Sequence, residues 1–279
     1  MPSRTDLLII GGGRMGAALV SGLLGSGKAS GVIAIVEKDE SRRSELVDLL
    51  PGTYVMESIG EGLSARAAIL AVKPAQAEEA CAIAKAATSC RVLSIMAGVP
   101  IRALETWLGA GPAVLRAMPN TPALVGAGVT ALAGGSSAMK EDLEWGLGIL
   151  NAVGEVVAVD ESLLDAVTGL SGSGPAYVFL ATEALVKAGV AAGLPAEVSR
   201  VLARQTVVGA AKLLAESDQE PEFLRAQVTS PGGTTEAGIA ALEAHGFEEA
   251  LRVAVAAAAD RAAEMGQELT ARLQEPPQA

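Results

Sequence analysis

The chain has 279 residues, of which 50% are hydrophobic and 3% aromatic, and its 32 acidic against 21 basic residues give a formal net charge of −11. This length predicts about two domains, and the acidic balance argues against nucleic acid and anionic membranes as main partners, because both need clustered basic side chains. One histidine and two cysteines, Cys81 and Cys90, leave few soft ligands, so we expect no metal site, no disulfide framework and a reducing, cytoplasmic location.

The first half alternates short apolar runs with helical patterns, which is typical of a parallel sheet covered by helices on both faces. Strands are predicted at residues 7–10, 32–36, 67–72, 92–95 and 114–118, with 129–132 and 155–158 closing the sheet. Helices are predicted between them at residues 14–26, 41–50, 76–87, 101–108 and 141–152. We therefore expect an α/β Rossmann domain, doubly wound and mostly parallel, over residues 1–159.

The second half shows no convincing strand, and we expect residues 160–279 to form an all-α dimerisation and substrate-binding domain. Helices are predicted at residues 176–192, 195–215, 234–244 and 247–273, with a disordered tail from 274. The first of these is apolar on nearly every side, since its only charges are Glu183 and Lys187. Such a helix must be covered on several sides. We expect an interlocked helical dimer; the alternative is a monomer that buries the helix against its own neighbours.

Residues 11–16 (GGGRMG) fit the pattern G-x-G-x-x-G between the first predicted strand and the first helix. In that context the pattern predicts a dinucleotide-binding turn. Gly11 permits the tight turn, Gly13 lets the backbone approach a pyrophosphate, and Gly16 allows close packing of helix and strand. The helix N-terminus then offers free amides and a positive dipole end to the phosphates.

The end of the second strand gives conflicting signals about the cofactor. Glu37 can accept both ribose hydroxyls, which favours NADH, and it would repel a 2′-phosphate. Lys38, Arg42 and Arg43 follow it and could hold that phosphate instead. We leave the choice between NADPH and NADH open, with a slight preference for NADH.

Two further loops follow predicted strands and therefore face the same ligand crevice. Pro74 pushes Lys73 into an extended conformation and ends the strand after Ala71 and Val72. In the second loop, residues 118–122, two prolines hold a short Asn-Thr pair. The segment 171–175 (SGSGP) then opens the apolar helix, where small residues allow close approach of another chain or a ligand.

The stretch 228–236 (VTSPGGTTE) is the most unusual part of the second half. Two glycines are followed by two threonines at the start of a helix, which predicts free backbone amides beside hydroxyl groups. Such a cluster suits a small carboxylate.

Together these motifs, in this order and spacing, resemble pyrroline-5-carboxylate reductase, and the resemblance covers nearly the whole chain. It implies reduction of 1-pyrroline-5-carboxylate to L-proline by hydride transfer from NADPH or NADH, in the last step of proline biosynthesis. It also implies a homodimer, assembled in some members into a decamer. The family pattern departs here at Glu37, where many members carry Ser, Asn or Arg, and at Ser58, where some relatives carry Asn.

The resemblance also implies the site residues. The substrate-binding residues would be Val228, Ser230, Gly232, Gly233, Thr234 and Thr235, and the catalytic residue would be Thr235, with its hydroxyl facing the ring nitrogen. The cofactor-binding residues would be Gly11, Gly13, Arg14, Met15, Gly16, Glu37, Lys38, Arg43, Ala71, Val72, Lys73, Pro74, Ala97 and Asn120.

Two rival functions remain. A β-hydroxyacid dehydrogenase would also join a Rossmann domain to helices, but it needs a lysine soon after the glycine-rich segment, and residues 174–182 contain none. A non-catalytic NAD(P)-binding protein would bind dinucleotide without a carboxylate site, which the stretch 228–236 argues against.

Overall fold

The structure is a computed structural model that describes residues 4–27, 33–60, 62–88 and 90–274. Val32, at the start of a predicted strand, and residues 275–279 of the predicted tail lie outside the described residues. The chain forms two compact units: the first contains the residues up to Ser173 and those from Ala256 on, and the second contains Gly174–Val255. The predicted division at 159/160, placed where the predicted strands end, stays a prediction.

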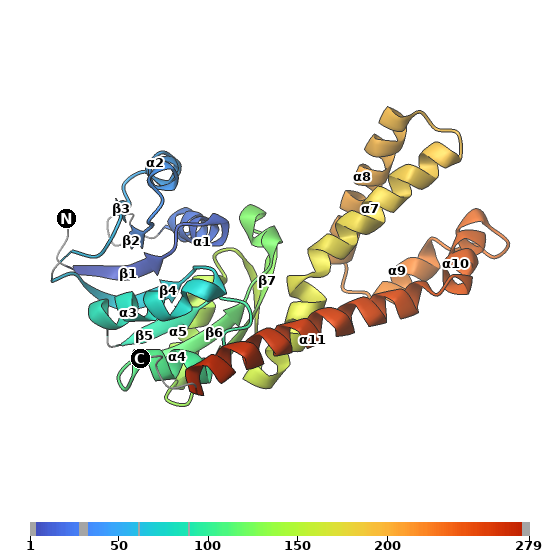
Figure 1. The fold of residues 1–279 in the computed structure, drawn as a ribbon. Helices are drawn as coiled ribbons and strands as arrows, with labels where there is room; N and C mark the ends of the chain where they lie inside the picture. The colour runs from blue at the N-terminus through green and yellow to red at the C-terminus, as the bar shows by residue number, and fades with distance from the viewer. Residues whose placement is uncertain (1–3, 28–32, 61, 89, 275–279) are drawn as a thin grey trace. The chain divides into compact units, whose positions relative to one another are not determined.

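The first unit holds an eight-stranded sheet with helices on both faces (Figure 1). In chain order its elements are β1 (Arg4–Ile10), α1 (Arg14–Gly25), β2 (Ile33–Val36), α2 (Glu40–Leu49), β3 (Tyr54–Met56), β4 (Ser64–Leu70), α3 (Ala77–Ala87), β5 (Arg91–Ser94), α4 (Ile101–Leu108), β6 (Ala113–Met118), β7 (Gly128–Gly134), α5 (Lys140–Leu150), β8 (Gly154–Ala158) and α6 (Leu164–Val167). The predicted strands and helices of the first half are all present. The short β3 was missed, because three residues after a Pro-Gly turn show no periodicity.

The strand order is β3-β2-β1-β4-β5-β6-β7-β8. All neighbours are parallel except β6 and β7, so the predicted doubly wound, mostly parallel sheet is confirmed. The chain crosses from β3 at one edge back to β4 beside β1, which makes the carboxyl ends of β1 and β4 the topological switch point. Ligands bind outside such a point in open α/β sheets.

Alternate residues of β1 build the two halves of the core. Leu8 and Ile10 pack with the side chains of α3 and α4, whereas Leu7 and Ile9 pack with those of α1, α2 and α5. Successive side chains of a strand point to opposite faces, so a continuous apolar run is what a sheet covered on both faces requires.

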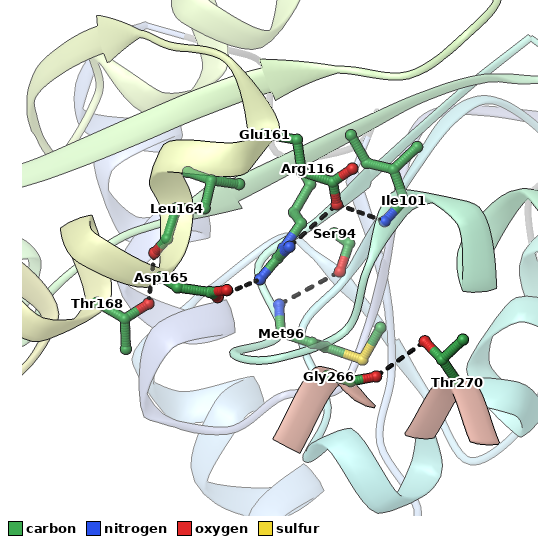
Figure 2. A network of polar contacts seen from close by, with 10 residues as sticks. All are labelled: Ser94, Met96, Ile101, Arg116, Glu161, Leu164, Asp165, Thr168, Gly266 and Thr270. Atoms are coloured by element: carbon green, nitrogen blue, oxygen red, sulfur yellow. Dashed lines mark hydrogen bonds and ion pairs between the residues drawn. The ribbon is translucent and has the colours of Figure 1, made fainter. Parts of the chain in front are cut away.

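A buried arginine ties β6 to the segment that follows the sheet (Figure 2). The guanidinium of Arg116 lies 3.0 Å from Oε1 of Glu161 and 3.8 Å from Oδ1 of Asp165. The same oxygen of Glu161 accepts a 2.7 Å hydrogen bond from the backbone N–H of Ile101, at the start of α4. One carboxylate therefore joins a strand, a helix start and a connecting segment.

The second unit is helical, as predicted. It contains α7 (Gly174–Ala191), α8 (Ala196–Ala215), α9 (Pro221–Gln227), α10 (Thr234–Ala244) and the first residues of α11 (Phe247–Gln274). The seven-residue α9 was not predicted. Ser199 of α8 is buried and its hydroxyl donates a 2.7 Å hydrogen bond to the carbonyl of Val186 on α7. A Cβ on Gly189 would lie 2.3 Å from that hydroxyl oxygen, so the glycine permits this close contact.

Helix α7 has no buried residue among its eighteen. Phe179 and Leu180 are 63% and 65% exposed. Within its own unit, α7 therefore keeps its apolar surface open, which argues against the alternative in which a monomer buries it against neighbouring helices. Among the described helices, none combines the length and the apolar character needed to cross a membrane.

Candidate active site

The glycine-rich turn between β1 and α1 leaves space for a ligand. Gly11 has φ +101°, and a Cβ there would lie 2.6 Å from the carbonyl oxygen of Ala71. A Cβ on Gly16 would lie 2.3 Å from the carbonyl oxygen of Gly11. A Cβ on Gly13, by contrast, would meet no atom within 4 Å. Gly11 and Gly16 are therefore required by the fold, and Gly13 keeps free the space that a pyrophosphate would need.

Helix α1 points its N-terminus at this space. Gly13 is the N-cap residue and supplies no side-chain cap. The amides of the first turn have no partner within an α-helix, so an anion can accept their hydrogen bonds and meet the positive end of the dipole. The open space beside Gly13 and the free amides of the first turn thus fit the diphosphate of a dinucleotide.

A cleft of about 250 Å³ lies at the carboxyl ends of β1, β2 and β4. Seven predicted cofactor residues line it: Gly11, Gly13, Glu37, Lys38, Ala71, Val72 and Lys73. Seven others are outside this lining: Arg14, Met15, Gly16, Arg43, Pro74, Ala97 and Asn120. The cofactor contacts of all fourteen residues stay predictions.

The cleft also has lining residues that the sequence analysis missed. These are Ile10, Val36, Gln76, Glu79, Ala80 and Ile83. Gln76, Glu79 and their neighbours come from α3 and the turn before it. The Lys73-Pro74 loop could have predicted them. A helix that begins directly after the carboxyl end of a strand starts at the same edge of the sheet, so the first residues of α3 must lie near the cleft.

Glu37 follows the last residue of β2 and its carboxylate is fixed by two backbone amides. Oε2 accepts a 2.9 Å hydrogen bond from Gly12, and Oε1 accepts a 2.9 Å hydrogen bond from Asp39. The side chain is half-buried and lines the cleft. It therefore presents negative charge and acceptor capacity at the place where the fold positions the adenosine ribose.

Asn120 uses both ends of its side-chain amide on the backbone. Its Nδ2 donates to the carbonyl of Ser171 at 3.1 Å, and its Oδ1 accepts from the amide of Val129 at 3.0 Å. A Cβ on the neighbouring Gly172 would lie 2.5 Å from Cε of Met118, which explains part of the need for small residues in this segment. The observed role of Asn120 is to position loops at the end of β6.

The loop before α10, in the second unit, forms a tight turn. Gly232 has φ +69°, and the amide of Gly233 donates to the carbonyl of Ser230 at 2.9 Å. The amide of Gly232 donates to Oε2 of Glu236 at 2.7 Å. The amides of Gly232 and Gly233 thus donate hydrogen bonds within the loop. Of the predicted cluster of free amides, those in the first turn of α10 remain available to a ligand.

That first turn is open. Gly233 is the N-cap residue without a side-chain cap, and Thr234 and Thr235 are exposed. Two hydroxyl groups accompany the first-turn amides, which have no helical partner. The segment therefore has the donors that a small carboxylate requires, and its substrate-binding role stays a prediction.

Two family models match the chain. Residues 161–265 match the model described as pyrroline-5-carboxylate reductase dimerisation. Residues 6–98 match the model described as NADP oxidoreductase coenzyme F420-dependent. The dimerisation match covers α7 with its exposed apolar surface, and the chain is therefore an oligomer-forming one.

Similar proteins cover nearly the full length. The pyrroline-5-carboxylate reductases of Synechocystis sp. and Corynebacterium melassecola are 43% and 40% identical, over 94% of this chain and 98% and 99% of theirs. Among solved structures, the reductase from Coxiella burnetii has a TM-score of 0.87 at 37% identity, covering 94% of this chain and 98% of that one. The Plasmodium falciparum enzyme, solved with NADP bound, has a TM-score of 0.78 at 30% identity with the same coverage. The chain belongs to the pyrroline-5-carboxylate reductase family.

Proposed function

We propose that this chain reduces 1-pyrroline-5-carboxylate to L-proline with NADH or NADPH, as the last step of proline biosynthesis. The observation that carries the proposal is the coverage of the similarity. A relative of that name matches 94% of this chain and 98% of its own length, and the two family models cover the dinucleotide turn, within residues 6–98, and the loop before α10, within residues 161–265.

The chemistry requires little beyond positioning. Reduction adds a hydride to the carbon of the ring C=N bond and a proton to its nitrogen, which yields a secondary amine. When bound, the reduced nicotinamide supplies the hydride. Holding the reactants in contact can contribute roughly 7–11 kcal/mol for ideal placement. The reaction needs neither a metal nor a covalent nucleophile.

The loop before α10 and the first residues of α10 bind and orient the substrate. The first-turn amides of α10 and the hydroxyls of Ser230 and Thr234 hold the carboxylate, with Val228, Gly232 and Gly233 shaping the loop around it. The hydroxyl of Thr235 faces the ring nitrogen, directly or through water. An alcohol is a poor acid at neutral pH, so Thr235 orients the iminium rather than protonating it.

We also propose that the enzyme is a homodimer, assembled further into a decamer, and that it works in the cytoplasm. The exposed apolar side chains of α7 support the dimer, because an apolar helix needs cover on several sides.

A spectrophotometric assay tests the function. Oxidation of NADH and NADPH is followed at fixed enzyme concentration with and without 1-pyrroline-5-carboxylate, and proline is identified as the product. We expect oxidation only with the cyclic imine present. Oxidation of a 3-hydroxy acid with NAD⁺ or NADP⁺, and no turnover of the imine, would instead identify a β-hydroxyacid dehydrogenase.

A further inference from the structure

We infer that the ribose end of the cleft selects NADH over NADPH, because Glu37 is fixed there as an acceptor while the cations beside it are held by acidic and carbonyl groups. This inference deepens the proposed function and rests on its dinucleotide site. It concerns residues 37–43, where an acidic residue that favours NADH is followed by three basic residues that could hold a 2′-phosphate.

Glu37 cannot readily leave the cleft. Its two carboxylate oxygens accept 2.9 Å hydrogen bonds from the amides of Gly12 and Asp39, so a rotation away would break both. A carboxylate oxygen can accept a second hydrogen bond besides the one it makes. The fixed group therefore suits a ribose with two hydroxyl donors, and it places like charge against a ribose that carries a phosphate.

Arg43 is held by the backbone of the same turn. Its Nη1 donates to the carbonyl of Glu37 at 3.1 Å and to that of Lys38 at 2.6 Å. Its Nη2 lies 3.7 Å from the carboxylate of Glu57. To bind a 2′-phosphate, this guanidinium would have to give up contacts that hold the turn after β2.

Arg42 is held in a similar way. Its Nε donates to the carbonyl of Gly12 at 2.7 Å, and its Nη1 lies 2.7 Å from the carboxylate of Glu45. The side chain thus stabilises the glycine-rich turn, and Arg42 is not among the residues that line the cleft.

Lys38 is the remaining cation, and it lines the cleft. Its ammonium pairs with the carboxylate of Glu79 on α3, another lining residue. Both side chains are about half exposed, so this pair is weaker than the contacts of the two arginines. The lining thus contains two acidic groups, Glu37 and Glu79, against Lys38 and Lys73. A doubly charged 2′-phosphate beside Glu37 meets repulsion, and Lys38, Arg42 and Arg43 are already paired with other groups.

The test is calorimetric titration of the full-length protein with NADH and with NADPH, without substrate. We expect NADH to bind at least about tenfold more tightly, since a like charge at close range is worth that factor or more. Glu37→Gln keeps the size of the side chain and an amide oxygen but removes the charge, and it should reduce the NADPH-to-NADH ratio of Kd by about tenfold. Glu37→Ser should also lower the NADPH-to-NADH ratio of Kd.

Glu40→Gln is the matched control, because it removes one charge from the same segment at an exposed residue outside the cleft lining. It should leave the ratio nearly unchanged. Raising the salt concentration should also lower the preference of the wild type, as screening weakens charge repulsion.

Equal or tighter binding of NADPH by the wild type, or an unchanged ratio in both Glu37 variants, would overturn the inference while leaving the proposed reaction intact. Binding of neither nucleotide would overturn the dinucleotide site itself, and the inference with it.

Discussion

Thr235 is the residue that the proposed chemistry depends on most. Replacing Thr235 with Ala removes the hydroxyl that orients the ring nitrogen, and loss of one such hydrogen bond should lower kcat by about tenfold or more. The Kd for NADH should stay the same, because the residue lies outside the dinucleotide turn. Thr235→Ser keeps a hydroxyl and should retain most of the activity. Unchanged turnover in Thr235→Ala, measured by steady-state kinetics, would remove the residue from the mechanism.

The glycines of the dinucleotide turn have separable roles. Gly13→Ala introduces a Cβ that meets no protein atom within 4 Å, so stability should change by less than about 0.5 kcal/mol while dinucleotide affinity falls sharply. Gly16→Ala places a Cβ 2.3 Å from the carbonyl oxygen of Gly11 and should cost about 1–3 kcal/mol of stability. Thermal unfolding and calorimetric titration separate the two effects. Full dinucleotide affinity in Gly13→Ala would show that the ligand lies elsewhere.

At the scale of elements, the Arg116 cluster joins β6, the start of α4 and the segment before α6. Arg116→Ala leaves the partly buried carboxylate of Glu161 without its ion pair and should lower the free energy of unfolding by about 2–3 kcal/mol. The control is Arg66→Ala, which removes an exposed pair with Asp6 at 3.8 Å and should cost less than about 0.5 kcal/mol. Equal losses in urea denaturation would show that the cluster does not hold these elements together.

A second ionic contact joins β5 to the first turn of α5. Burial acts to raise the pKa of Asp142, but the amide of Met139 and the ion pair with Arg91 outweigh it and hold the pKa below its usual range. Because the folded-state pKa is depressed, the carboxylate contributes stability above about pH 4, and this contribution is lost as the pH falls through the folded-state value.

Asp142→Asn should therefore unfold at a lower temperature than the wild type at pH 7, and the two should converge as the pH falls through the depressed pKa of Asp142. Thermal melts followed by circular dichroism across this range measure the difference. A gap that stays constant with pH would contradict the assignment.

At the scale of the whole molecule, assembly should depend on α7. Leu180 is 65% exposed on this apolar helix, and Leu180→Arg should convert the oligomer to monomer because a charge would be buried at the contact. Val47→Arg is the control, since Val47 is 55% exposed on α2 in the first unit. Mass photometry distinguishes the outcomes. An oligomer that tolerates Leu180→Arg would place the contact on another surface.

Much of the architecture could be predicted, because local sequence patterns determine the strands, the helices and the glycine-rich turn. The continuous apolar runs indicated a sheet covered on both faces, and the position of GGGRMG after a strand indicated the turn now seen between β1 and α1. The short β3 and α9 were not predictable, since three and seven residues carry too little periodicity.

Tertiary contacts set the remaining limits. Nothing near Glu37 in the sequence shows that the amide of Gly12, 25 residues away, binds its carboxylate. Likewise, the role of Asn120 at the cofactor stays a prediction, and nothing near it in the sequence shows that its side chain bonds to the backbone of Ser171 and Val129. Hydrogen bonds between residues far apart in the sequence determine the chemistry of a site, and the spacing of residues within a motif does not predict them.

A crystal structure with both a dinucleotide and proline bound would locate the two ligands directly. We expect the diphosphate at the glycine-rich turn before α1, and the proline carboxylate on the amides of Thr234 and Thr235 with the ring nitrogen toward the Thr235 hydroxyl. Proline bound at any place other than the start of α10 would contradict the proposed substrate site.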